Sequence, residues 1–237
     1  MTSFNHIRFA DGTELSLAEW LGQPVHSVVE FASTAGVTKL RAFNYVRGQN
    51  VSSLGLPKRG ATEQDTNLVK AQAMNQDEAL LCFSITVECF GLSAIVNAQG
   101  GVFTIAPTPL LSGTDLRRLE RDAMLNLFVG AGVKKPQFEA PFVYYGQSVG
   151  ATINGPGDTG GTSALALDYG TMGRVTGTNQ HMFDLPIYIG GFGDQARPGN
   201  SMTFFAEFKN AYGGPFVGLR QDVRLNIRCD GLKKRPA

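Results

Sequence analysis

The stretch VRLNIRC, Val223–Cys229, decides the fold class of this chain. Its apolar residues alternate with arginine and asparagine, so they share one face when the backbone is extended. The segments Met202–Phe208 and Leu81–Phe90 show a similar alternation with a period of two residues. Each of these segments is expected to form a β-strand with one buried face, and the chain is expected to be an all-β protein.

Further strands are predicted where β-branched and aromatic residues run between glycine, proline and polar segments. They are His26–Ser33, Thr38–Val46, Val102–Ala106, Ala140–Tyr145, Ala164–Tyr169 and Met182–Ile189. The polar region from Arg47 to Thr66, which contains Gly, Ser and Pro, is predicted to be a long loop. About ten strands in a chain of 237 residues favour one β-sandwich or barrel domain.

One segment, near residues 114–129, is predicted to be a helix inserted between strands. Ser112 followed by Asp115 resembles a capping signal, and Gly130 or Gly132 would end the helix. Its two faces are an apolar one with Leu116, Leu119, Ala123, Met124, Leu127 and Phe128, and a polar one with Arg117, Arg118, Arg121 and Asp122. Acidic residues interrupt the basic face, which favours a solvated surface over a nucleic-acid contact.

The expected domain organisation is an N-terminal arm over residues 1–24, a β-sandwich over residues 25–232, and a basic C-terminal tail over residues 233–237. Within the arm, Leu15–Leu21 is interpreted either as a helical turn or as an arm lying on a neighbouring subunit. The candidates for contact with other molecules are Trp20, Lys233, Lys234 and Arg235.

The balance of charges excludes a strong global attraction to nucleic acid or to a membrane surface. Lys and Arg number 21 and Asp and Glu number 20, so the formal net charge is +1. Only 17% of the residues are charged, which suits a protein whose flanks are covered by neighbours or one with a neutral, Gly-rich surface. No signal peptide and no apolar stretch of membrane-spanning length is recognised.

The cysteines and histidines do not form recognisable metal patterns. Cys82, Cys89 and Cys229 lie in predicted strands without CxxC spacing, so buried free thiols are expected. His6 and His26 are far from His181 in the sequence, and no metal site is expected. Gly155–Thr162 has the spacing of a phosphate-binding loop but carries glycine where the lysine belongs, so no cofactor is expected.

One motif indicates an enzyme. Gly146–Gly150 matches G-x-S-x-G around Ser148, and Asp168 and His181 follow in the order of the α/β-hydrolase triad. That chemistry needs the serine on a tight turn from a strand into a helix. The residues after Ser148 run into Gly155-Pro156-Gly157, which a helix does not tolerate. We therefore expect no catalytic activity, and a serine hydrolase stays a minor alternative.

The order of segments over residues 66–236 resembles that of jelly-roll capsid proteins from tailless and related bacterial viruses. The resemblance is one of pattern, without a diagnostic motif or a catalytic residue. It is carried by Thr66–Leu68 before Leu81–Val87, a mid-chain helix ending in Phe128–Gly130, Leu185–Ile187 before Ala196–Asn200 and the strand at Met202, and the ending Val223–Pro236.

The resemblance implies a virion structural protein that is made in the host cytoplasm and assembles with copies of itself, as trimers or larger capsomers. A single jelly roll with elaborated loops is preferred, and a compact double jelly roll is the alternative. Other virion proteins, and the genome or an internal lipid membrane contacted through Lys233–Arg235, are the further partners implied. The alternative function is a virion or cell-surface attachment module that binds a receptor or a sugar.

Overall fold

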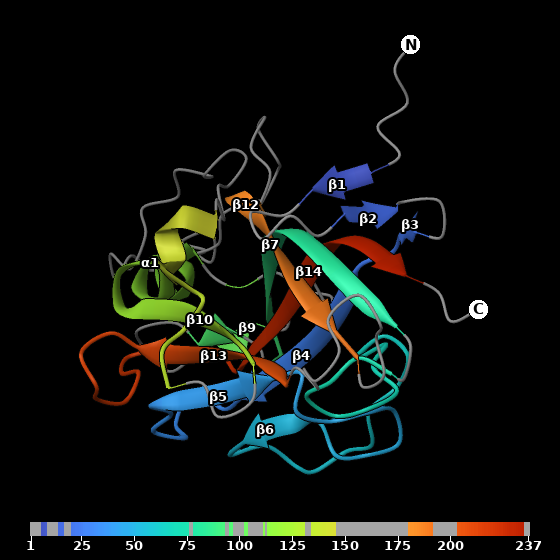
Figure 1. The fold of residues 1–237 in the computed structure, drawn as a ribbon. Coiled ribbons are helices and arrows are strands. Elements are labelled where there is room, and N and C mark those ends of the chain that lie inside the picture. The colour runs from blue at the N-terminus through green and yellow to red at the C-terminus, as the bar shows by residue number, and fades with distance from the viewer. Residues whose placement is uncertain are drawn as a thin grey trace.

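The computed structural model describes residues 6–8, 14–16, 20–75, 78–92, 95–96, 102–103, 111, 113–130, 134–145, 180–191 and 203–234. Within these residues the protein consists mainly of two β-sheets packed in separate layers (Figure 1). The sequence-based expectation of an all-β sandwich is confirmed at this level. One α-helix, α1 (Gly113–Asp122), lies at the side of the sandwich beside β10 (Ala123–Val129).

The larger sheet has the strand order β12-β7-β14-β4-β6, with β3 paired to the far end of β14. All its neighbouring strands are antiparallel except β4 and β6, which are parallel. Its strands are β3 (Trp20–Gly22), β4 (Val25–Phe31), β6 (Ser52–Leu54), β7 (Ala79–Gly91), β12 (Gln180–Gly190) and β14 (Val223–Lys234).

The smaller sheet is antiparallel, with the order β11-β10-β13-β5. Besides β10 it contains β5 (Lys39–Ala42), β11 (Phe138–Pro141) and β13 (Phe204–Asn210). Two separate hairpins complete the described strands: β1 (His6–Arg8) with β2 (Glu14–Ser16), and β8 (Ile95–Val96) with β9 (Val102–Phe103).

Eight of these strands pair in a nested order along the chain. The first, β4, pairs with the last, β14; β5 pairs with β13; β7 pairs with β12; and β10 pairs with β11. Two further pairings, β7 with β14 and β10 with β13, join these four hairpin-like pairs into the two sheets. Each sheet is therefore built from segments that lie far apart in the sequence.

The core fills the space between the two sheets. The apolar residues of Val223–Cys229 are all fully buried, which confirms the alternation on which the fold class was predicted. Phe31 from the larger sheet stacks on Phe208 from the smaller one with ring centroids 5.9 Å apart. The three cysteines, Cys82, Cys89 and Cys229, are buried and free, as expected from their spacing.

The predicted helix over residues 114–129 is only half correct. The helix ends at Asp122, and Ala123–Val129 is the strand β10, which pairs with β13 along its whole length. Leu125, Leu127 and Val129 are buried with the period of a strand. Over so short an apolar run, helical and strand periods overlap, and the available pairing partners decide between them.

Two other element predictions are wrong in part. The predicted strand Ala140–Tyr145 ends at Pro141 and continues as the 3₁₀ helix η1 (Phe142–Tyr145). The predicted loop Arg47–Thr66 contains the short strand β6, which pairs with β4. The predicted strand Ala164–Tyr169 lies outside the described residues.

The larger sheet includes residues on both sides of the segment 25–232. The strand β3 begins at Trp20, inside the segment expected to be an arm, and pairs with Leu232–Lys234 of the same chain. The helical alternative for Leu15–Leu21 is wrong, because both ends of that segment lie in strands. The strand β14 runs through Lys233 and Lys234, so the larger sheet includes two residues of the expected basic tail.

Candidate functional site

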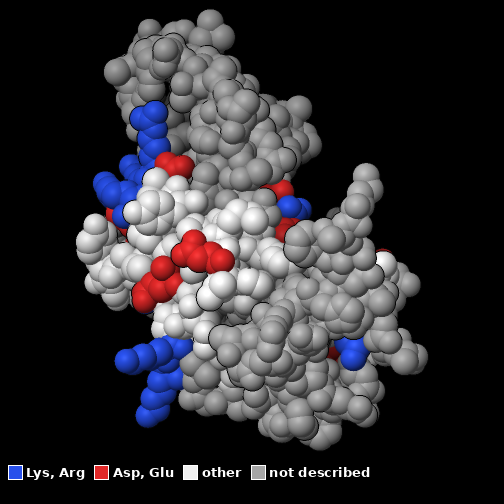
Figure 2. Space-filling view, turned by 45° about the horizontal axis from the view of Figure 1, so that its top comes forward, with Lys and Arg blue, Asp and Glu red and all other residues white. Residues whose placement is uncertain are grey.

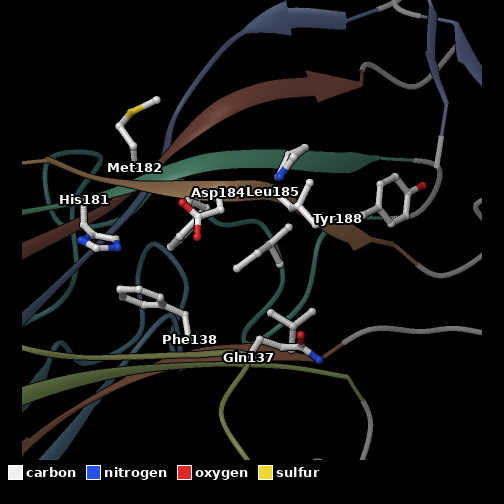
Figure 3. A pocket seen from close by; sticks show the side chains of 11 residues that line it. Gln137, Phe138, His181, Met182, Asp184, Leu185 and Tyr188 are labelled. Carbon is white, nitrogen blue, oxygen red and sulfur yellow. The ribbon is translucent and has the colours of Figure 1, made fainter. Parts of the chain in front are cut away.

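The outer strands β12 and β11 leave a groove between the two sheets. The groove is a cavity of about 590 Å³ and is lined from both layers (Figure 3). Its described lining residues are Val129, Gln137, Phe138 and the continuous segment 181–188 of β12. A cavity of this size lies within the range of small-molecule sites in proteins.

The strand β12 carries an irregularity where it borders this groove. Its pairing with β7 is regular up to Met182 and resumes at Ile187, with a register shift between these two residues. Pro186 lies inside the shift and has no N–H to donate to a neighbouring strand. As a result Leu185, which regular alternation would turn toward the core with Phe183 and Ile187, is 79% exposed.

The inner wall of the groove is aromatic. The ring centroid of Phe138 lies 4.6 Å from that of His181 and 4.9 Å from that of Phe183, in an edge-to-face arrangement with the latter. These contacts join β11 of the smaller sheet to β12 of the larger one. In Figure 3, Met182 extends away from the cavity, whereas the ring of His181 and the carboxylate of Asp184 extend toward Phe138 and Gln137.

The strand β12 and the neighbouring helix η1 carry exposed apolar side chains. Met182 is 60% exposed, and Val143 and Tyr144 of η1, which lies against β12, are 52% and 63% exposed. We call Val143, Tyr144, Met182 and Leu185 the edge patch. Exposed large apolar side chains on neighbouring elements are typical of surfaces that contact another molecule.

A second cluster, of charged residues, lies on the larger sheet near β4 and β14. The carboxylates of Glu30 and Asp65 are buried, and Arg59 donates to both, with shortest distances of 2.6 Å to Glu30 and 2.7 Å to Asp65. Arg224 of β14 contacts the same two carboxylates at 3.2 and 3.0 Å. We call these four residues the ionic cluster. Its ion pairs Arg59–Glu30 and Arg224–Asp65 hold the segment that contains Arg59 and Asp65 against the larger sheet.

Hydrogen bonding decides the charge state of the ionic cluster. Burial by itself raises the pKa of Asp65, but hydrogen bonds from Arg59 and Thr62 outweigh burial and hold the pKa well below its usual range. Hydrogen bonds to Asp65 and Glu30 raise the pKa of Arg59 above its ordinary value. The sequence analysis missed this cluster, because its members are far apart in the chain and no local motif joins them.

Of the three residues suggested for a hydrolase, the structure describes only His181. Ser148 and Asp168 lie outside the described residues, and His181 lies on β12 with its ring against Phe138 and Phe183. Within the described residues, no group of three or more His, Cys, Asp or Glu side chains is arranged to hold a metal ion. The sequence analysis did not identify Phe138 or Asp184 as site residues.

The residues suggested for contacts with other molecules are placed as follows. Trp20 is only 7% exposed and packs near Tyr188, with ring centroids 6.5 Å apart. Lys233 forms an ion pair with Glu78 at 3.1 Å. Lys234 is partly exposed at the end of β14, and Arg235 lies outside the described residues. Trp20 and Lys233 are therefore engaged within their own chain.

The described surface has no single dominant charge. In Figure 2, basic side chains gather near the margins of the visible face, acidic ones lie between them, and a wide uncharged area surrounds the acidic group. This distribution agrees with the formal net charge of +1. None of the helices described here is long and apolar enough to cross a membrane.

Comparison of the chain with protein-family models, curated proteins and solved structures gives no significant match.

Proposed function

We propose that this protein is a jelly-roll structural subunit of a bacterial-virus shell and that it assembles with copies of itself. The nested pairing of eight strands supports a single jelly roll, since that fold forms when a long antiparallel hairpin of four strand pairs rolls into two sheets. Apart from the two short hairpins β1–β2 and β8–β9, the described strands belong to one such sandwich, which favours the single form over the compact double form.

The edge patch is the observation that carries the proposed assembly. A strand at the edge of a sheet offers unpaired backbone groups, and monomeric proteins usually protect it with charged residues or cover it. The described part of β12 carries Asp184 and Pro186, but it also presents the exposed apolar side chains of Met182 and Leu185, and the neighbouring helix η1 presents Val143 and Tyr144. Contact with another copy would remove this apolar surface from water.

The shell proposal also follows from the resemblance in segment order, with the expected trimers or larger capsomers. In a closed shell, the same patch on every copy meets the same partner surface, so a modest contact is repeated many times. Other virion proteins and the genome are further partners in this proposal.

The test is assembly of the purified protein, followed by light scattering over a concentration series and by electron microscopy. Particles or capsomers are expected. Leu185→Lys places a charge in the edge patch and is expected to raise the concentration needed for assembly by about tenfold. The matched control is Val217→Lys, which adds the same charge at a residue that is 68% exposed and outside the patch.

Unchanged assembly of Leu185→Lys, or equal loss in Leu185→Lys and Val217→Lys, would remove the edge patch from the proposal. A parent protein that stays monomeric at high concentration would contradict the shell function itself. Circular dichroism of both variants shows whether the sandwich still forms.

A further inference from the structure

The groove between β12 and β11 combines aromatic rings with a single charged side chain. Among its described lining residues, Asp184 is the only one with a formal charge at neutral pH, and there is no lysine or arginine. The Asp184 side chain is exposed and forms no ion pair with a described residue. The charge of the groove therefore favours a cation over an anion.

The rings that line the groove suit a cation as well. Phe138 and Phe183 are partly buried against the core and line the cavity, where the ring of His181 lies beside them. The face of a phenyl ring attracts a cation, and this attraction grows where water is partly excluded. Aromatic rings beside a carboxylate suit guanidinium and alkylammonium groups, because the rings and the carboxylate both attract the same cation.

The register shift in β12 produces this arrangement. In a regular strand, neighbouring side chains point to opposite faces, so Phe183 and Asp184 would be separated by the sheet. The shift between Met182 and Ile187 frees this part of β12 from the ladder. In Figure 3 the Asp184 carboxylate accordingly lies on the side of the strand that faces Phe138.

We propose that this groove binds an organic cation, with the Asp184 carboxylate pairing with a guanidinium or alkylammonium group beside the rings of Phe138 and Phe183. This site is independent of the proposed shell function. The cation comes either from a free small molecule or from the basic side chain of another protein copy. A neutral polar ligand would donate a hydrogen bond to Asp184 but would gain no attraction between opposite charges.

The test uses methylguanidinium and methylurea, which have nearly the same shape and differ in charge. Titration of the ¹⁵N-labelled protein is followed by amide chemical shifts. Methylguanidinium is expected to shift the amide signals of residues 137–138, 181–185 and 187–188, and methylurea is expected to bind at least about fivefold more weakly. Equal binding of the two probes, or shifts that lie elsewhere in the protein, would overturn the proposal.

Two variants distinguish the contribution of the Asp184 carboxylate to binding from that of the aromatic rings. Asp184→Asn keeps the side-chain shape and is expected to weaken methylguanidinium binding about fivefold without changing methylurea binding. Phe138→Leu is expected to weaken methylguanidinium binding about threefold, because the cation loses a ring face. Glu63→Gln is the control, since it removes a highly exposed carboxylate outside the groove. Similar effects of Asp184→Asn and Glu63→Gln would contradict a local site.

The source of the cation is identified by sedimentation of the assembled protein. If a basic side chain of another copy occupies the groove, millimolar methylguanidinium competes with it and shifts the protein to smaller species. If the natural ligand is a free molecule, methylguanidinium binds with the same Asp184 dependence and leaves the assembly unchanged. Both outcomes support the cation site, whereas dissociation that persists equally in Asp184→Asn contradicts it.

Discussion

At the scale of single residues, Asp65 joins the ionic cluster to the backbone around Thr62. It accepts hydrogen bonds from Arg59 at 2.7 and 2.8 Å and from the Thr62 backbone N–H at 2.8 Å. Its side chain is only 2% exposed. Removal of a buried partner leaves the remaining charges uncompensated, which usually costs more than the ion pair contributes.

The substitution Asp65→Asn is expected to lower the free energy of unfolding at pH 7 by about 2 to 3 kcal/mol. This value is below that for a fully buried pair, because Arg59 is 39% exposed and partly screened by water. Chemical denaturation measures the difference. Glu63→Gln is the control, since Glu63 pairs with Arg47 at the surface and is expected to change stability by less than about 0.5 kcal/mol.

The cost of Asp65→Asn is also expected to depend on pH. Because the folded protein holds the pKa of Asp65 below its usual value, the stabilisation is present above the unfolded pKa of about 4. It is lost as the pH falls through the lower, folded pKa. The difference between parent and variant is therefore expected to shrink from pH 4 downward, and a constant difference between pH 7 and pH 2.5 would contradict this assignment.

At the scale of elements, the sequence predicts strands well where one face is buried. Val223–Cys229 alternates between buried and partly buried residues in β14, whereas Ser84 and Thr86 of β7 are buried together with Ile85 and Val87, so both faces of that strand are covered there. The end of α1 could not be predicted, because Ala123–Val129 fits a helical face as well as a strand and its partner β13 begins at Phe204, far along the chain. Non-local pairing, rather than local preference, decides that segment.

The irregular pairing of β14 with β7 depends on a glycine. A register shift follows Asp230, and a Cβ atom added to Gly231 would lie 2.0 Å from the carbonyl oxygen of Leu81. Because the obstacle is backbone of the neighbouring strand, it cannot rotate away. Gly231→Ala is expected to lower the free energy of unfolding by about 3 kcal/mol.

The control for this prediction is Gly22→Ala in β3. Gly22 pairs with Leu232, next to Gly231, yet a Cβ atom at Gly22 would meet nothing within 4 Å. Its substitution is expected to change stability by less than about 0.5 kcal/mol. Urea denaturation compares the two variants. Equal effects would show that the close approach of Gly231 to β7 does not limit stability.

At the scale of the whole molecule, nested pairing joins strands from the two halves of the chain, as in β4 with β14 and β5 with β13. The sequence indicated the fold class and a single sandwich, but the candidate site could be predicted only in part. His181 was noted for a catalytic role, and the structure places it in an aromatic contact with Phe138. That contact and the position of Asp184 depend on the register shift in β12, which no local pattern in the sequence specifies.

The reaction rate of the three buried cysteine thiols measures how often the sandwich opens. Cys82, Cys89 and Cys229 are at most 3% exposed and lie on the adjacent strands β7 and β14. Burial raises the pKa of the Cys89 thiol, and hydrogen bonding with Cys82 together with burial raises that of Cys229. Reaction with a thiol reagent is expected to be at least about a hundredfold slower in the native protein than in denaturant.

This prediction is checked by following thiol modification with time at increasing urea concentration. The three thiols are expected to react together, with rates that follow the unfolding transition. A thiol that reacts rapidly in the native protein would show that β7 and β14 separate without unfolding of the remaining sandwich.

The position of β14 has a consequence for how the protein is made. This strand lies between β7 and β4 in the larger sheet, but the ribosome synthesises it after all the other described strands. Until β14 leaves the ribosome, β4 and β7 lack the strand that lies between them, and the larger sheet cannot form as one piece. The nascent chain therefore completes its larger sheet after translation of β14, and its unpaired strands need protection from neighbouring chains during that interval.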